Sequence, residues 1–294
     1  MHAIAAYARL VRRPRTYATT QSARDYLAKP KGSGQPPSHL GRSNRYLVTH
    51  ETVVGFDCYS VRSTTDRTND GPSVVYVHGG AYVNEIQPEH WKMICAIVDA
   101  TGCSVQVPLY GLAPQHRAEQ AIDFLLEVTG RAALRGPFYM VGDSSGAGLA
   151  LATTQSIISE ATTPPIGLTL ISPWLDIGLT NPAIATIAER DPWLAVPGLR
   201  ECGRVWSGGL AADDNRVSPI FGALHNLPPI DLYVGDRDIF VGDCRRLRDS
   251  VGPDRITYHE QPGAIHVYPL LPVPEGKAAR HRLLSHMRAA LRLT

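Results

Sequence analysis

Short apolar runs alternate with amphipathic stretches from about residue 52 to the end of the chain. The run SVVYV at 73–77 is rich in β-branched residues and is typical of a buried strand. Comparable runs lie at 104–107, 138–141, 167–171, 231–234 and 255–258. Apolar residues at helical spacing lie at 90–100, 119–128, 148–158 and 275–291. This alternation predicts an α/β fold, with a mostly parallel sheet covered by helices on both faces.

Two regions depart from the alternation. Residues 1–45 are basic and end in the stretch KPKGSGQPPS, whose prolines and glycines predict a loop. Residues 176–216 combine helical patches with three prolines and the pair Gly208-Gly209. Neither region has the pattern of an independent core. Because open α/β sheets bind ligands at the carboxyl ends of their strands, we expect both regions to form a lid over that end.

Charge and composition argue against several classes of function. The 29 basic and 27 acidic residues give a net charge of +2, too small to indicate a nucleic acid or an anionic membrane as partner. No apolar run reaches the roughly 18 residues that span a bilayer, and the N-terminal residues lack the charge order of a secretory signal. The five cysteines have no metal-ligand spacing. We therefore expect a cytoplasmic protein with no integral membrane segment and no metal.

The motif Gly142-Asp143-Ser144-Ser145-Gly146 carries the strongest chemical signal, because it lies between a predicted strand and a predicted helix. In a nucleophile elbow the serine occupies a tight strand-to-helix turn, and the flanking glycines remove side chains that would collide there. The amino end of the following helix directs N–H groups towards developing negative charge. A structural glycine turn and a phosphate-binding loop are the alternatives, but the lysine of a phosphate-binding loop is absent.

A second glycine motif, His78-Gly79-Gly80-Ala81, follows the strand at 73–77 directly. Acyl transfer requires backbone N–H groups that point to the position of the oxyanion, and glycine lets the backbone approach a substrate closely. We expect this turn to form an oxyanion hole together with the N–H of Ser145, the residue after the nucleophile. A structural role for His78 is favoured over a role as general base.

The acid and the histidine of a catalytic triad should follow the serine in that order. Asp236 and Asp238 come just after the strand at 231–234, and from spacing alone either could be the acid. His266 lies in a glycine-containing loop after the strand at 255–258 and is the favoured base. His259, at the end of that strand, is its nearest competitor.

Taken together, these motifs resemble the bacterial hormone-sensitive-lipase-like esterases, also called family IV carboxylesterases. The resemblance rests on the motifs at 78–80, 142–148 and 265–266, and further matches lie at 112–116, 172–176 and 237–240. It spans roughly residues 45–290. Ala81 stands where many members carry a third glycine, and Ser145 stands where alanine is usual. Because backbone N–H groups act at both positions, we expect these differences to leave the chemistry intact.

The resemblance implies an α/β-hydrolase fold with an eight-stranded sheet, a small helical cap and no cofactor. It implies Ser144 as nucleophile, His266 as base and Asp238 as orienting acid, with Gly79, Gly80, Ala81 and Ser145 around the oxyanion. The domain division that follows is a lid segment at 1–45 and a catalytic domain at 46–294, with a cap insertion at about 176–216. The expected partner is a small ester with a short- to medium-chain acyl group, and homodimerisation is an open expectation.

Two rival functions remain open on the same fold. One is a non-catalytic small-molecule receptor such as the plant gibberellin receptors, which lack a working base, whereas His266 is present here. The other is a different acyl hydrolase, such as a lactonase, an amidase or a peptidase, and of these the lactonase is the hardest to separate from an esterase. Fold alone does not decide the substrate.

Overall fold

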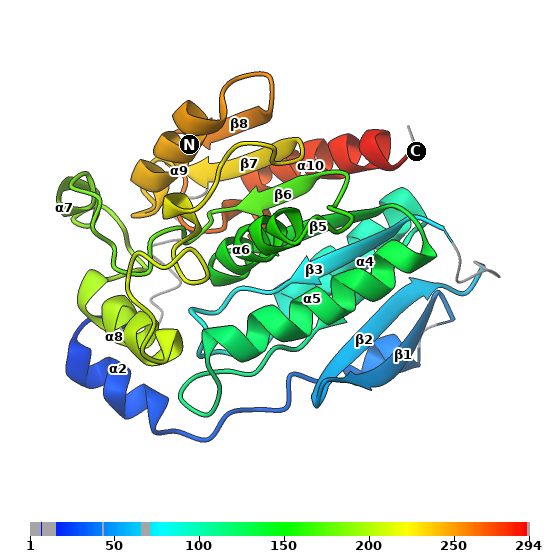
Figure 1. The fold of residues 1–294 in the computed structure, drawn as a ribbon, viewed down its shortest axis with the longest axis horizontal. Helices are drawn as coiled ribbons and strands as arrows, with labels where there is room; N and C mark the ends of the chain where they lie inside the picture. The colour runs from blue at the N-terminus through cyan, green and yellow to red at the C-terminus, as the bar shows by residue number, and fades with distance from the viewer. Residues whose placement is uncertain (1–6, 8–15, 43, 66–70, 293–294) are drawn as a thin grey trace.

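A mostly parallel eight-stranded sheet forms the centre of the protein (Figure 1). The computed structural model describes residues 7, 16–42, 44–65 and 71–292. The strand order is β1-β2-β4-β3-β5-β6-β7-β8; β1, β2 and β4 pair antiparallel, and every pair from β4 to β8 is parallel. The strands are β1 (Tyr46–Val53), β2 (Phe56–Ser63), β3 (Ser73–Val77), β4 (Ser104–Pro108), β5 (Phe138–Asp143), β6 (Leu168–Ile171), β7 (Ile230–Gly235) and β8 (Ile256–Gln261). The predicted α/β class and the eight strands implied by the resemblance are confirmed.

Helices cover both faces of the sheet, as the alternation predicted. On one face the core includes apolar residues of α4 (Pro88–Thr101) and α10 (Pro274–Arg292). On the other face it includes residues of α5 (Ala118–Arg135), α6 (Ser145–Ser159) and α9 (Val241–Val251). Local sequence sets some of these bounds: α4 begins at Pro88, whose fixed φ suits a first turn, and ends before Gly102 at a φ of 75°.

The shorter helices lie mostly outside these two layers. They are α2 (Thr20–Leu27), α3 (Ser38–Gly41), α7 (Ile184–Ile187) and α8 (Val196–Ser207), with 3-10 turns η1 (Pro219–Phe221) and η2 (Tyr268–Leu270). Figure 1 shows α2, α7 and α8 together beyond one end of the sheet. The N–H of Gly198 donates to the carbonyl of Tyr17 at 2.9 Å, and Arg24 pairs with Glu201 at 2.8 Å. The segment before α2 and α2 itself are thus joined to α8 by polar contacts.

The apolar pattern does not predict β1, β2 or α9. Most residues of β1 are exposed, so its sequence lacks the alternation of a half-buried strand. In α9 the charged residues outnumber the large apolar ones, and burial is concentrated in its first turn, from Val241 to Cys244, with Leu247 beyond it. The predicted loop at the end of the N-terminal region is confirmed, since residues 30–37 form no helix or strand. The part of the predicted lid at 1–6, 8–15 and 43 lies outside the described residues.

Candidate active site

Ser144 lies in the tight turn between β5 and α6, as predicted for a nucleophile elbow. Its φ of 54° and ψ of −123° are strained for a residue with a side chain, and they direct Oγ away from both elements. A Cβ on Gly142 would lie 2.6 Å from the carbonyl oxygen of Gly146, and one on Gly146 would lie 2.2 Å from that of Val77. Both glycines are therefore required by the close packing of α6 against β3 and β5.

His266 connects Ser144 to Asp238. Its Nε2 lies 2.9 Å from Ser144 Oγ, and its Nδ1 lies 2.8 Å from Asp238 Oδ2. The three side chains come from the β5–α6 turn, the loop after β8 and the loop between β7 and α9, at the carboxyl ends of parallel strands. All three residues are buried. The other oxygen of Asp238 accepts the N–H of Phe240 at 3.0 Å, which fixes the carboxylate.

The two competitors are engaged elsewhere. Asp236 Oδ1 accepts the N–H of Gly263 at 2.7 Å and so joins the two loops without touching His266. His259 Nε2 lies 2.9 Å from Asp231 Oδ1, in a separate cluster under α10. The structure therefore brings together Ser144, Asp238 and His266 and not their alternatives.

The charged groups around His266 raise the pKa of its imidazole. Burial lowers the pKa of its imidazole, but Asp238, with further contributions from Asp191 and Asp143, raises the pKa above its ordinary value. Asp191 lies in the segment between α7 and α8, and burial together with the charge of Asp238 raises its pKa to about 6. Asp191 has no motif around it and was not predicted from the sequence.

The turn at 78–82 has the geometry expected of an oxyanion hole. Ala81 and Tyr82 have φ values of 55° and 62°, and Gly80 has a φ of 134°. In the described part of the chain, the N–H groups of Gly80, Ala81 and Ser145 have no hydrogen-bond acceptor. Three donors are thus available beside Ser144.

Gly79 differs from its neighbours in the turn and corrects one expectation from the sequence. Its N–H donates to Asp143 Oδ1 at 3.1 Å, so Gly79 shapes the turn and its N–H is already occupied. A Cβ there would lie 2.3 Å from Asp143 Oδ2. His78, as predicted, has a structural position: it stacks on Tyr110 at 4.6 Å, and burial lowers its pKa to about 4.

Asp143 belongs to the motif at 142–146, and its carboxylate also binds the motif at 78–81. Besides Gly79 N–H, it accepts the hydroxyl of Tyr76 at 3.0 Å and Nε2–H of His90 at 3.2 Å. The other ring nitrogen of His90 accepts the N–H of Gln87 at 2.9 Å, which places the proton on Nε2. Burial raises the pKa of Asp143, but these partners outweigh it and lower the pKa below its ordinary value. This network holds the turn at 78–82, called the oxyanion turn below, against the turn at Ser144.

Large aromatic side chains form a continuous wall behind the site. Trp206 of α8 stacks on Tyr82 at a centroid distance of 4.4 Å and an angle of 4°. Tyr82 contacts Trp174, and Trp174 stacks on Phe240 at 5.7 Å. The rings of Phe240 and His266 are nearly perpendicular, with their centroids 5.2 Å apart. These ring contacts link the helix α8 to the turn at 78–82 and to His266.

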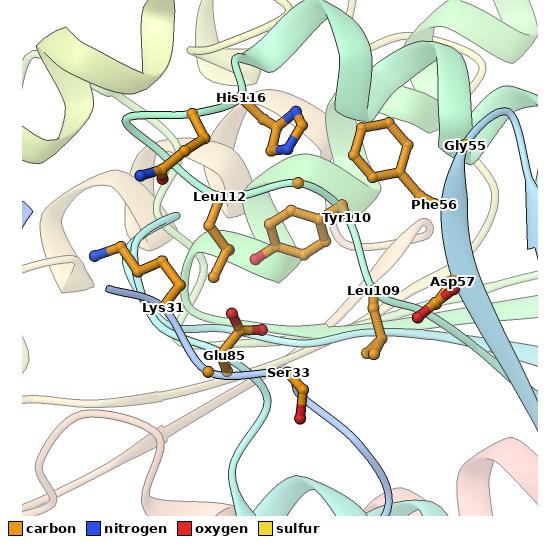
Figure 2. Close-up of a pocket in the computed structure, with 13 residues that line it drawn as sticks. Lys31, Ser33, Gly55, Phe56, Asp57, Glu85, Leu109, Tyr110, Leu112 and His116 are labelled. Atoms are coloured by element: carbon orange, nitrogen blue, oxygen red, sulfur yellow. The ribbon is translucent and has the colours of Figure 1, made fainter. Parts of the chain in front are cut away.

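A groove of about 470 Å³ lies behind the oxyanion turn and contains none of the three triad residues (Figure 2). Figure 2 shows Lys31 and Glu85 on one side of it and Phe56 and His116 on the other. Tyr110 connects the groove to the turn, since its hydroxyl donates to the carbonyl of His78 at 2.7 Å. The groove is therefore separate from the position where an acyl group would meet Ser144.

Metal and membrane sites do not appear in the described part of the chain. No group of three or more His, Cys, Asp or Glu residues described in the structure is placed to hold a metal ion. None of the described helices combines the length and the apolar character required to cross a membrane.

Two curated relatives carry names that agree with this site. A triacylglycerol lipase of Mycobacterium tuberculosis is 31% identical over 214 residues, which cover 70% of this chain and 43% of the relative. An acetyl-hydrolase of Streptomyces hygroscopicus is 30% identical over 223 residues, which cover 71% of this chain and 73% of the relative. The chain thus spans less than half of the mycobacterial lipase and about three quarters of the acetyl-hydrolase.

The fold and the family agree as well. The structure of an esterase from the bacterial hormone-sensitive lipase family matches with a TM-score of 0.76 at 24% identity, covering 92% of this chain and 95% of that one. A family model described as the alpha/beta hydrolase fold matches residues 74–270, about two thirds of the chain. The resemblance drawn from the motifs is confirmed, and the chain belongs to the α/β-hydrolase fold family.

Proposed function

We propose that this protein is a serine ester hydrolase in which Ser144 is the nucleophile, His266 the general base and Asp238 the acid that orients His266. The observation that supports this most directly is the pair of hydrogen bonds that joins the three side chains, at 2.9 Å and 2.8 Å. The names of the relatives, a lipase and an acetyl-hydrolase, support an ester as the substrate.

The reaction proceeds through an acyl-enzyme. Ser144 Oγ attacks the carbonyl carbon of the ester while His266 Nε2 takes the proton, and Asp238 stabilises the imidazolium through Nδ1–H. Nε2–H then protonates the leaving alkoxide as the ester bond breaks. A water molecule gives its proton to Nε2 and attacks the acyl carbon, and the carboxylic acid leaves as Ser144 regains its proton. No cofactor is needed for any step.

The N–H groups of Gly80, Ala81 and Ser145 stabilise the oxyanion in both tetrahedral intermediates. They carry no other hydrogen bond in the described structure. The turn at 78–82 also packs closely on Ser144, since a Cβ on Gly79 would lie 2.9 Å from the Cβ of Ser144. Ser145 begins α6, so the positive end of that helix dipole also faces the developing charge. Gly79, whose N–H is bound to Asp143, is left out of this set.

The proposed substrates are esters with acyl chains of about two to eight carbons, because buried aromatic side chains limit the space behind the site. Trp174, Trp206 and Tyr82 provide this limit. The acetyl-hydrolase among the relatives supports a short acyl group. Residues 1–45 and 176–216 are proposed as the lid over a catalytic domain at 46–294, and a cytoplasmic location and homodimerisation stay predictions from sequence.

The test measures hydrolysis of p-nitrophenyl esters from acetate to palmitate, with a panel of lactones in parallel. We expect Ser144→Ala to keep the fold by circular dichroism and to lose turnover by a factor on the order of 10⁴–10⁶. A fluorophosphonate probe should label the unmutated protein at Ser144 and leave the variant unlabelled. Labelling at another serine with activity retained would contradict the assignment of the nucleophile, and a maximum of kcat/KM at palmitate would contradict the substrate class.

A further inference from the structure

The carbonyl oxygen of Gly80 is held from one side by Asn84. It accepts the backbone N–H of Asn84 at 2.9 Å and the side-chain Nδ2–H of the same residue at 2.8 Å. The N–H of Val83 adds a third contact at 3.1 Å. A Cβ on Gly80 would lie 2.6 Å from the carbonyl oxygen of Asn84, so the two residues are packed as closely as glycine allows.

This contact bears on the oxyanion hole because the Gly80 carbonyl shares a peptide plane with the N–H of Ala81. The peptide is trans, since the described cis bond is that between Ala113 and Pro114. In a trans peptide the C=O and the N–H point in opposite directions, so a donor that fixes the carbonyl also fixes the direction of the N–H. Donors on the carbonyl also polarise the peptide and strengthen its N–H as a donor.

The side chain of Asn84 is itself fixed at both ends of its amide. A carbonyl oxygen only accepts, so the contact with Gly80 assigns the amide nitrogen to that side. The second proton of Nδ2 is donated to the hydroxyl oxygen of Tyr17 at 2.7 Å, and Oδ1 accepts the hydroxyl of Tyr26. Tyr26 lies in α2 and Tyr17 lies just before it, so both anchors come from the N-terminal segment.

The oxyanion turn needs such a restraint because its backbone is strained. Ala81 and Tyr82 both lie in the left-handed region, which costs a residue with a side chain about 1–2 kcal/mol. Ala81 stands where a glycine would adopt this φ without cost. A strained turn keeps its conformation only when surrounding contacts determine it. The amide of Asn84 supplies one such contact. It binds the carbonyl of Gly80, in the same peptide as the Ala81 N–H that is a proposed donor.

We propose that Asn84 is a positioning residue that orients the Ala81 N–H towards the oxyanion, and that Tyr17 and Tyr26 make this orientation depend on the N-terminal segment. The inference rests on the proposed function, because it assigns the Ala81 N–H to an oxyanion hole. The N-terminal segment would then help to orient a catalytic N–H group, in addition to covering the site.

The test compares Asn84→Ala, Tyr17→Phe and Tyr26→Phe with the unmutated protein. Active sites are first counted by the p-nitrophenol that diethyl p-nitrophenyl phosphate releases, so that all rates refer to competent enzyme. We expect Asn84→Ala to lower kcat for p-nitrophenyl acetate about 10- to 100-fold with KM changed less than about twofold. The Ki of 1,1,1-trifluoro-2-octanone, whose adduct carries an oxyanion, should rise by a similar factor. Each Tyr→Phe variant should lower kcat about two- to fivefold.

Matched controls separate positioning from general stability. Gln106→Ala removes an amide that binds Ser60 at 3.2 Å, and Tyr46→Phe removes a hydroxyl that binds Asp99 at 2.8 Å. Both should lower stability without changing kcat or Ki per active site. If the unmutated protein turns over esters but Asn84→Ala keeps its kcat and Ki, the inference is wrong and the proposed function stands. If both Tyr→Phe variants keep kcat and Ki, the dependence on the N-terminal segment is wrong. No turnover and no p-nitrophenol release by the unmutated protein would overturn the proposed function itself.

Discussion

Replacing Asp238 by Asn should reverse the tautomer of His266. Asp238 accepts two donors, the N–H of Phe240 on Oδ1 and Nδ1–H of His266 on Oδ2. In Asp238→Asn the amide oxygen has to stay with Phe240, whose N–H only donates, and so the amide NH₂ faces His266. Nδ1 then has to accept, and the ring proton moves to Nε2, which faces Ser144 Oγ. A protonated Nε2 does not accept the proton of Ser144.

The expected cost is a fall in kcat by a factor on the order of 10⁴ near neutral pH, about 5.5 kcal/mol of transition-state stabilisation. The pH dependence should change as well. Catalysis needs neutral His266, and its pKa is raised, largely by Asp238, so kcat/KM of the unmutated protein declines as pH falls through that raised pKa. Without the carboxylate the pKa of His266 is lower, and the acid limb of the residual activity moves to lower pH.

Asp236→Asn is the matched control, two residues away and in the same loop. Its Oδ1 accepts the N–H of Gly263 at 2.7 Å, and an amide oxygen accepts the same bond, so only the charge is lost. We expect kcat within about threefold of the unmutated protein and a loss of stability of about 1 kcal/mol. The assay is hydrolysis of p-nitrophenyl acetate from pH 5 to pH 9, with folding checked by circular dichroism. Asp238→Asn within tenfold of the unmutated rate, or the reverse order of the two variants, would refute the assignment of the acid.

Three further substitutions test the electrostatics and packing of the site and the ion pair in the cluster under α10. Asp191→Asn removes a negative charge that helps to raise the pKa of His266, so the acid limb of kcat/KM should shift to lower pH; an unchanged pH profile would contradict this. Gly146→Ala places a Cβ 2.2 Å from a carbonyl oxygen of β3 and should cost about 2–3 kcal/mol in urea unfolding, together with most of the activity; normal stability would disprove the packing argument. His286 lies 3.1 Å from Asp231 and has a raised pKa, so its stabilising effect is present below the ordinary histidine pKa and lost as pH rises through the raised one. Because His286 is partly exposed, His286→Ala should cost about 1 kcal/mol or less near pH 6 and close to nothing at pH 9, measured as Tm, and an equal cost at both pH values would argue against the ion pair.

The sequence predicts most clearly the strands whose residues are buried throughout. All five residues of β3 and all six of β5 are buried, so their apolar runs are easily recognised. The hairpin of β1 and β2 lies at the edge of the sheet and keeps polar residues on both faces, which removes the signal. The same distinction explains α9, whose buried residues include a glycine, an aspartate and a cysteine and only two large apolar side chains. Prediction from periodicity fails where few of the buried residues of an element are large and apolar.

The residues of the candidate site also differ in how far the local sequence predicts them. Ser144 and the oxyanion turn are found from short motifs, because each turn requires glycines at fixed positions in the sequence. The choice between Asp236 and Asp238 is not local: both follow β7 within three residues, and only the loop carrying His266 decides which carboxylate meets the imidazole. Spacing leaves the two open, and the resemblance selects Asp238, the one that the structure places at His266.

The contacts that join these loops to the rest of the fold have no local signal, because each connects segments distant in sequence. Asp191 accepts the N–H of Ile239, the residue after the acid, at 3.0 Å, and Arg237 donates to the carbonyl of Arg190 at 3.0 Å. The acid loop is therefore joined to the segment between α7 and α8, as the oxyanion turn is joined through Asn84 to the segment around α2. Each of the two proposed lid regions thus contacts one of the two loops that carry the proposed catalytic groups. Movement of either region would change the direction of a reacting group as well as access to it, so substitutions at these junctions should alter kcat more than KM.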